Sequence, residues 1–448
     1  MRVDLLIKNG TIVTPERTFE GSIAVKDGKI AAVIAGGELP EADEVYDATG
    51  KVVTAGLIDG HVHFREPGVD YKEDFQTGST AAAFGGITTV IDMPNVKPPL
   101  SDLDSFNKKI ECGNARSLVD YGVFGVILQE NKDDLKAIAD AGIVGFKIFL
   151  GSTIGNIPAP DDGMMYEEFK IVAETGLRCG FHAENNQIIN HFTKQLKDAG
   201  VTDPKCFPES RPAVAEADAI NKVINFSKYT GAKVHIYHMS SKEGVELVKE
   251  AKAQGVDITA ETCPHYLLKN VSDYDKVGPI LKMNPPVRYK EDNERLWEGL
   301  NEGSVDMIAT DHSPHTKEEK SGNIWEATAG FCGVETSVPL MLTAVNEGKI
   351  SLTDYVRCAS ETPAKVWSIF PQKGSLYVGT DADITIIDMN KEGVIRNDEL
   401  HSKNNVGPYD GDKTKGAPVA TIVRGKFIMK DGELLGKPGY GQLVKPVR

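Results

Sequence analysis

The sequence predicts an α/β protein, a (β/α)8 TIM-type barrel with a small β-sandwich domain built from both termini. Two observations predict the barrel. Eight short apolar segments typical of buried strands recur through the middle of the chain, and helix-like stretches separate most of them. A third observation predicts the small domain, because segments rich in strand-forming residues and tight-turn dipeptides stand at both ends of the chain.

The terminal segments resemble each other more than they resemble the middle. Residues 3–13 (VDLLIKNGTIV) and 22–36 (SIAVKDGKIAAVIAG) each have strand–turn–strand character, with an Asn-Gly and an Asp-Gly turn. Residues 381–389 and 417–435 repeat this style near the C-terminus. We therefore expect residues 1–52 and 366–448 to form the small β-domain, and 53–365 to form the barrel.

Strands that alternate with helices indicate a parallel sheet, and eight such units favour a closed barrel. An open doubly wound sheet is the alternative, although no GxGxxG motif opens a helix. The predicted strands are 52–64, 87–93, 121–127, 144–150, 178–184, 233–239, 257–263 and 306–311.

Composition excludes several classes of protein. The formal net charge of -15 argues against a nucleic-acid partner, although one local arginine can still bind an anionic small molecule. The six cysteines form no CxxC motif, which favours a reducing compartment without disulfides. Asp4 and Lys8 interrupt the apolar start of the chain, and no segment is long and apolar enough to span a membrane. We expect a cytoplasmic protein with no membrane partner.

Residues that can bind a metal stand where the predicted strands end. In a barrel the C-terminal strand ends converge on one mouth, where active sites are built. This coincidence across several strands is stronger evidence than any single residue. The residues are His61, His63, Lys147, His182, His238 and Asp311.

His61 and His63 lie two residues apart, so they share one face of a strand. Two imidazoles on one face can bind one divalent ion, and imidazole suits zinc. His182 and His238 could supply a second ion, with His235 as a competitor for His238. His265 follows the seventh strand and could support the ligands. Histidines held only by hydrogen bonds are the alternative.

Lys147 and Asp311 complete the set. An ammonium group has no acceptor, but a neutral amine that captures CO2 becomes a carbamate whose two oxygens could bridge two cations. A lysine paired with an acid is the alternative for Lys147, whose neighbours are apolar. Asp311 could take a proton from water as a general base and return it as an acid. A helix N-cap is the alternative for Asp311.

These residues resemble the amidohydrolase superfamily over nearly the whole chain, specifically the cyclic-amide branch that holds dihydroorotase, allantoinase and hydantoinase/dihydropyrimidinase. The resemblance implies two Zn2+ per chain, bridged by carboxylated Lys147 and a hydroxide. The other ligands it implies are His61, His63, His182, His238 and Asp311, with Asp311 catalytic. It also implies a small-molecule cyclic amide substrate and a homodimer or homotetramer.

The first half of the chain is most similar to dihydroorotase, through HVHFREPG (61–68) and YKEDFQTGSTAAAFGGITTVIDMPN (71–95). That resemblance implies that Arg65 and Asn95 hold the substrate carboxylate, with Asn284 and His315 as further substrate contacts. Arginine can grip a carboxylate through two hydrogen bonds. Backbone groups of 330–336 would face the ring. We therefore expect a zinc-dependent dihydroorotase of pyrimidine biosynthesis, which hydrolyses dihydroorotate reversibly to N-carbamoyl-aspartate.

The second half also looks like allantoinase, through GPILKMNPPVR, DHSPH and NIWEATAG. Lysine at position 147 is standard in the hydantoinase and allantoinase branches. Allantoinase or hydantoinase/dihydropyrimidinase is therefore the alternative function. A non-catalytic dihydropyrimidinase-like assembly protein is a remote alternative, because all six ligand positions are filled. Arg65 has an alternative as a surface residue paired with Glu66 or Asp70. The Gly- and Pro-rich loop 151–163 could flank or cover the site.

Overall fold

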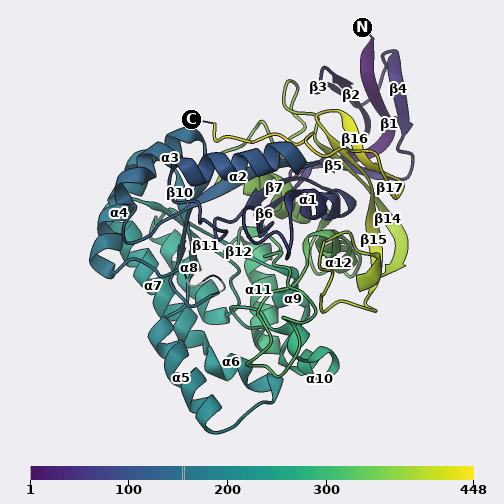
Figure 1. The fold of residues 1–448 in the computed structure, drawn as a ribbon. Coiled ribbons are helices and arrows are strands. Elements are labelled where there is room, and N and C mark those ends of the chain that lie inside the picture. Colours follow the sequence, from purple (N-terminus) through teal and green to yellow (C-terminus); the bar gives the residue numbers. More distant parts are fainter. Residues whose placement is uncertain (1, 154, 156, 448) are drawn as a thin grey trace.

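The computed structural model describes residues 2–153, 155 and 157–447. Its larger part is the predicted barrel, in which eight parallel strands follow one another in chain order (Figure 1). The first and last strands nearly meet, because Val62 forms a parallel bridge with His312 and the His63 N–H donates to the His312 carbonyl at 2.8 Å. The barrel strands are β6 (Leu57–Val62), β7 (Ile87–Asp92), β8 (Asp120–Val126), β9 (Gly145–Phe149), β10 (Arg178–His182), β11 (Lys233–Ile236), β12 (Ile258–Thr262) and β13 (Met307–Ile308).

Helices surround the barrel strands (Figure 1). Side chains at the chain entrances fix several of them; for example, Asp74 caps the first helix by accepting from the Thr77 N–H at 2.7 Å. The longer helices are α1 (Phe75–Phe84), α2 (Leu103–Arg116), α3 (Leu135–Ala141), α4 (Asp162–Thr175), α5 (Asn186–Asp198), α7 (Ala213–Thr230), α8 (Lys242–Ala253), α11 (Lys290–Glu302) and α12 (Val334–Asn346). The shorter ones are α6 (Phe207–Ser210), α9 (Pro264–Leu268), α10 (Tyr274–Val277), α13 (Leu352–Val356) and α14 (Thr362–Val366).

Large aromatic side chains fill part of the barrel interior. Trp367 and Tyr237 are buried and stacked, with ring centroids 5.9 Å apart, and Phe124 packs edge-on against both. The opposite end of this aromatic layer touches the residues of the mouth, since the Tyr237 ring lies 4.6 Å from the His61 ring. The aromatic layer therefore forms a rigid floor beneath the predicted metal ligands.

The smaller part is one mostly antiparallel sheet made from both ends of the chain, drawn in purple and yellow beside the barrel (Figure 1). Its strands run in the order β17-β16-β15-β14-β5-β1-β2-β3, and β4 pairs with β1. The predicted fold class is confirmed. The strands are β1 (Val3–Val13), β2 (Thr18–Lys26), β3 (Lys29–Ile34), β4 (Ala42–Asp47), β5 (Val52–Ala55), β14 (Ile384–Val394), β15 (Lys413–Val423), β16 (Lys426–Lys430) and β17 (Glu433–Leu434).

The predicted first barrel strand, 52–64, is divided between the two sheets. Its first part is β5, which pairs with β14 in the terminal sheet, and its second part is β6 of the barrel. The division falls at Gly56, where a Cβ atom would come within 2.1 Å of the Thr88 hydroxyl. Only glycine fits at the point where the chain passes from one sheet to the other. One continuous apolar segment therefore contributes a strand to each sheet.

The predicted Asn-Gly turn at 9–10 is also wrong. Strand β1 runs through it, and Asn9 takes a φ of 60° at a register shift between Ile7 and Gly10. A residue with positive φ can form a bulge as well as a turn. A Cβ on Gly10 would lie 2.5 Å from Val53, so the close packing against β5 leaves room only for glycine here. The Asp-Gly pair at 27–28 does turn between β2 and β3, as predicted.

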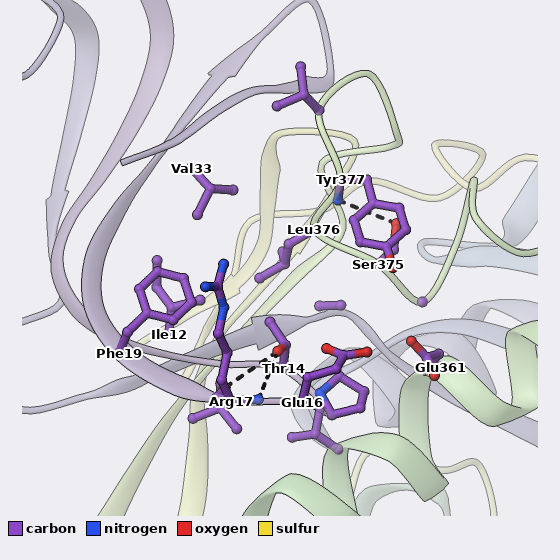
Figure 2. Close-up of a pocket in the computed structure, with 16 residues that line it drawn as sticks. Ile12, Thr14, Glu16, Arg17, Phe19, Val33, Glu361, Ser375, Leu376 and Tyr377 are labelled. Carbon is purple, nitrogen blue, oxygen red and sulfur yellow. Dashed lines mark hydrogen bonds between the residues drawn. The ribbon is translucent and has the colours of Figure 1, made fainter. Parts of the chain in front are cut away.

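A cluster of buried charged residues around Lys373 joins the barrel to the terminal sheet. The buried Lys373 ammonium contacts Asp120, at the start of β8, as well as Asp381 at 3.0 Å and Asp383 at 2.7 Å near β14. A second place is hollow. A cavity of about 300 Å³ lies between the β1–β2 turn, where Arg17 lies over the Phe19 ring, and the wall formed by Leu376 and Tyr377 (Figure 2).

The long connection between β14 and β15, residues 395–412, reaches the barrel mouth; we call it the mouth loop. It holds the segment that follows β6, because Lys403 Nζ donates to the Asp70 carbonyl at 2.6 Å and Asn404 donates to the carbonyls of Tyr71 and Lys72 at 3.0 and 2.7 Å. The terminal part of the chain therefore supports residues near the predicted site. Among the helices that the model describes, none has the length and apolarity needed to cross a bilayer.

Candidate active site

The predicted residues come together at the C-terminal ends of the barrel strands. Nine of them line one narrow cavity. His315 stands behind Arg65 rather than in the cavity wall, 3.5 Å from its guanidinium. The nine residues are His61, His63, Arg65, Asn95, Lys147, His182, His238, Asn284 and Asp311.

His61 and His63 each have one ring nitrogen held and one directed at the same carboxylate. Nδ1 of His61 lies 2.5 Å from Glu261 Oε1, and Nδ1 of His63 lies 2.7 Å from Asn95 Oδ1. These acceptors place the protons on Nδ1. The two Nε2 atoms face Asp311 Oδ1 at 3.3 and 3.0 Å, so they are left as lone-pair donors beside an anionic oxygen.

His182 and His238 form a second pair across the cavity, with Nδ1 of His182 lying 3.1 Å from Nε2 of His238. Glu184 accepts from Nε2 of His182 at 2.7 Å and is itself held by the buried Arg211. Nδ1 of His238 is buried and has no hydrogen-bond partner. His238, and not His235, lines the cavity, because His235 lies behind and bonds the far oxygen of Glu261 at 3.2 Å.

Lys147 projects from β9 over an aromatic face. Its ammonium nitrogen lies 3.7 Å from the Tyr237 ring centroid, and it makes no ion pair with any residue that the model describes. Burial lowers the pKa of Lys147 to about 7. A large fraction is therefore the neutral amine at neutral pH, which is the form that can capture CO2.

The donor atoms suit a divalent cation. Ligand atoms of His61, His238 and Asp311 all lie within 4.8 Å of one another. Burial lowers the pKa values of the four mouth histidines, which keeps them as the neutral imidazoles that bind metal. The buried Nδ1 of His238 has no hydrogen-bond partner, so its lone pair is available to a metal ion. The residues therefore fit the metal centre that the resemblance implies.

Three residues of the mouth have strained backbones. Arg65, His238 and Asp311 take φ values of 65°, 40° and 49°, each just after a barrel strand ends. Positive φ is costly for residues other than glycine and concentrates at functional sites. Arg65 lies two residues after His63, but it does not continue the alternating face of a strand. Strand β6 ends at Val62, and the sharp turn, not the strand, directs Arg65 to the mouth.

Arg65 is only 2 % exposed, which excludes the alternative of a surface arginine. Its Nη2 donates to Ser313 Oγ at 2.5 Å, and its buried Nε has no partner. It forms no ion pair within the described part of the chain, and Glu66 is paired with Arg116 instead. A buried guanidinium with unused donors can bind an oxygen of a ligand.

Sequence patterns missed several residues that complete the site. Glu261 ends the apolar strand β12, and this position of a polar residue could have identified it. Tyr237 gave no signal, because an aromatic residue in a strand normally indicates core packing. His265 is buried against Phe331 and does not line the cavity. The cavity-wall residues that the sequence did not single out are Phe149, Met283, Ser313 and Ala329.

Two further segments were expected near the site. Of the loop 151–163, Thr153 lines the cavity, while residues 154 and 156 lie outside the described residues. Of 330–336, the Gly333 N–H donates to His312 Nδ1 at 3.0 Å, so this backbone group supports the strand end.

Known proteins are similar to this chain over nearly its whole length. The model of the amidohydrolase family matches residues 52–428. An L-hydantoinase from Paenarthrobacter aurescens is 38 % identical over 449 residues, with 98 % of each chain covered. An allantoinase from Escherichia coli O139:H28 is 36 % identical, with 96 % of this chain and 95 % of its own covered.

The solved structures agree. The L-hydantoinase (dihydropyrimidinase) from Arthrobacter aurescens has a TM-score of 0.96 at 38 % identity and covers 99 % of this chain and 100 % of its own. A dihydropyrimidinase from Brevibacillus agri NCHU1002 has a TM-score of 0.92 at 29 % identity, with 99 % of each chain covered. These relatives favour the alternative function over the dihydroorotase expected from the first half of the sequence.

Proposed function

The chain belongs to the amidohydrolase family, and from this premise we propose that it is a metal-dependent hydrolase of cyclic ureides, of the hydantoinase and allantoinase kind. One observation of the site supports a ureide most directly. The side-chain oxygen of Asn284 is buried at the cavity wall and has no hydrogen-bond partner. A ureide ring carries N–H groups, one of which would satisfy this acceptor; dihydroorotate carries them too, so the choice of a neutral ring rests on the relatives.

The residues for the cations are those of the two histidine pairs. His61, His63 and Asp311 would hold one cation, and His182 and His238 the other, with carboxylated Lys147 as the bridge. Imidazole and carboxylate ligands suit Zn2+. When bound, such cations lower the pKa of water and polarise an amide carbonyl.

The chain's own residues then move the proton. Hydrolysis joins the oxygen of water to the ring carbonyl carbon and breaks the bond from that carbon to the ring nitrogen. Asp311 Oδ1, between His61 and His63, is placed to take the proton of the attacking water. The same carboxyl group returns the proton to the leaving nitrogen, so no other proton carrier is needed.

Dihydroorotase remains a second candidate because of Arg65. A neutral ring uses this buried guanidinium only through a carbonyl oxygen, whereas the carboxylate of dihydroorotate would pair with its charge. Asn95 has its side-chain oxygen on His63, at 2.7 Å, and only its amide N–H groups remain for a substrate.

The deciding experiment compares zinc-loaded protein on hydantoin, allantoin, dihydrouracil and dihydroorotate, each with the Arg65→Met variant. We expect a neutral ureide to be hydrolysed fastest. Preference for dihydroorotate, lost in Arg65→Met with metal retained, would establish the second candidate instead. Absence of turnover of every ring, with about two ions bound per chain, would point to the non-catalytic alternative.

We also propose the setting that the sequence predicts, a homodimer or homotetramer in the cytoplasm. All six cysteines are free thiols, as a reducing compartment requires. Sedimentation of the purified protein would measure the number of subunits. The domain boundaries at 52 and 366 stay a prediction; β5 lies just beyond the first of them.

A further inference from the structure

His315 stands between two side chains that can only donate hydrogen bonds. Its Nδ1 lies 3.0 Å from Lys72 Nζ, and its Nε2 lies 3.5 Å from Arg65 Nη2. His315 has no exposed surface, and burial beside these cations lowers its pKa far below the ordinary value, so the ring is neutral. A neutral imidazole has one acceptor nitrogen. It can therefore accept from Lys72 or from Arg65, but not from both.

The distances favour Lys72 as the donor, because its contact with His315 is the shorter by 0.5 Å (3.5 against 3.0 Å). If Nδ1 accepts from Lys72, the ring proton is on Nε2. Nε2 then cannot accept from Arg65. Arg65 is left with the bond from Nη2 to Ser313 and with an unpartnered Nε.

We infer that Lys72 is a positioning residue: by donating to His315 it fixes the ring tautomer, and so keeps the guanidinium of Arg65 available for an oxygen of the substrate. The inference rests on the proposed function for the identity of the substrate, but not for the tautomer. Lys72 does not line the cavity, so it acts through His315 and Arg65.

Lys72 is itself held firmly for this role. It is only 6 % exposed, its ammonium pairs with Glu319 at 2.8 Å, and its carbonyl accepts from Asn404 of the mouth loop at 2.7 Å. Glu319 Oε2 also lies 3.3 Å from His315 Nδ1. If Lys72 were absent, the Glu319 carboxylate could accept a hydrogen bond from a protonated Nδ1 of His315.

Removal of Lys72 is therefore expected to reverse the whole arrangement. Glu319 would accept the proton of His315 Nδ1, Nε2 would become the acceptor, and Arg65 would bond to His315. Its guanidinium would then have to leave the histidine before it could bind a substrate oxygen. Ground-state and transition-state binding would weaken together, so KM should rise while kcat changes little.

The experiment uses full-length, zinc-loaded protein with 15N-labelled histidine, and His315→Gln identifies the His315 signals. In the unchanged protein we expect the shifts of an Nε2–H tautomer. Lys72→Met should convert them to Nδ1–H, and Lys72→Arg, which keeps a donor, should restore Nε2–H. Lys97→Met, at an exposed lysine, is the matched control and should leave the signals unchanged.

The same variants are assayed on the ring that the unchanged protein hydrolyses best. Lys72→Met should raise KM about tenfold, the effect of one lost hydrogen bond, with kcat within about twofold. Lys72→Arg should recover most of the change. An Nδ1–H tautomer in the unchanged protein, which needs no variant to fold, would overturn the inference.

The inference would also be overturned if folded Lys72→Met kept the Nε2–H tautomer, or if its kcat fell by as large a factor as its KM rose. The nitrogen shifts need no substrate, so they separate the two proposals. If no ring is hydrolysed, the proposed function fails, while the tautomer still supports or overturns the role of Lys72.

Discussion

At the scale of single residues, the site is organised by the partners that hold one ring nitrogen of His61, His63 and His182. Glu261, Asn95 and Glu184 occupy Nδ1 of His61, Nδ1 of His63 and Nε2 of His182. These partners choose the tautomer and the ring orientation before any ion arrives. The histidine rings are therefore oriented by carboxylate and amide side chains that are not themselves proposed metal ligands.

Glu261→Gln is expected to weaken metal binding by about 10- to 100-fold, because the amide keeps the shape but accepts less strongly from Nδ1 of His61. Competition with a chelator measures the affinity. Glu168→Gln is the matched control, since Glu168 is also a buried glutamate but lies on α4 away from the cavity. Equal affinity of the Glu261 variant and the unchanged protein would contradict this role.

Lys147 predicts a pH dependence of metal loading. Its pKa is lowered to about 7, so the ammonium form dominates below pH 7 and the neutral amine above it. Only the amine captures CO2, so in bicarbonate buffers adjusted to the same concentration of dissolved CO2 the initial rate of zinc loading should fall about tenfold from pH 8 to pH 6. Atomic absorption after rapid desalting measures the loading. Lys147→Ala should bind less metal and show no such bicarbonate dependence; the same profile in this variant would refute the assignment.

At the scale of elements, the eight barrel strands follow from the alternation of apolar segments with helical stretches. Their ends do not, because an end depends on pairing with distant residues. The segment 52–64 divides at Gly56 because its first part pairs with β14, which lies far along the chain. Likewise β11 stops at Ile236, and His238 reaches the mouth through a strained turn that no local pattern announces.

Gly180 on β10 tests how closely the strands support Lys147. A Cβ at this position would lie 2.0 Å from the Tyr237 ring, on which the Lys147 ammonium rests. Gly180→Ala should therefore lower the unfolding free energy by about 1–3 kcal/mol and reduce activity by displacing Tyr237. Urea unfolding and turnover of the best ring are the measurements.

The control for Gly180→Ala is Gly163→Ala in the first turn of α4, where the added carbon would meet only the Asp161 side chain at 3.3 Å. This variant should keep full activity. If Gly180→Ala were as active and as stable as the control, the barrel interior would accommodate the extra carbon without displacing Tyr237, and the prediction would be wrong.

At the scale of the whole molecule, local motifs and overall similarity pointed to different substrates. HVHFREPG and the following segment resemble dihydroorotase, whereas relatives matched over nearly the full length are named hydantoinase and allantoinase. The six positions proposed to bind metal stand in or just after barrel strands, which is why the sequence singles them out, and all six line one cavity. The residues that choose a substrate come from separate loops, such as Asn284 and Ser313, and their meeting is a tertiary property.

Lys373 joins the two domains, and its loss is expected to be costly. Lys373→Met would leave three buried carboxylates without their shared cation, which should lower the unfolding free energy by about 3–5 kcal/mol. Thermal and urea unfolding are the measurements. Lys391→Met, at an exposed lysine of β14, should change stability by less than about 0.5 kcal/mol. Similar melting of both variants would show that the ion cluster does not hold the domains together.

The terminal sheet cannot be completed until the end of the chain has been synthesised. The Leu57 N–H finds its partner in the Thr385 hydroxyl, 328 positions later in the chain. At about 5–20 residues per second, strands β1 to β5 emerge roughly 15–65 s before β14 can join them. During that interval their unpaired edge is open to other nascent chains. Synthesis at high density should therefore favour aggregation of this protein, and a chaperone that shields the emerging N-terminal strands should raise its yield.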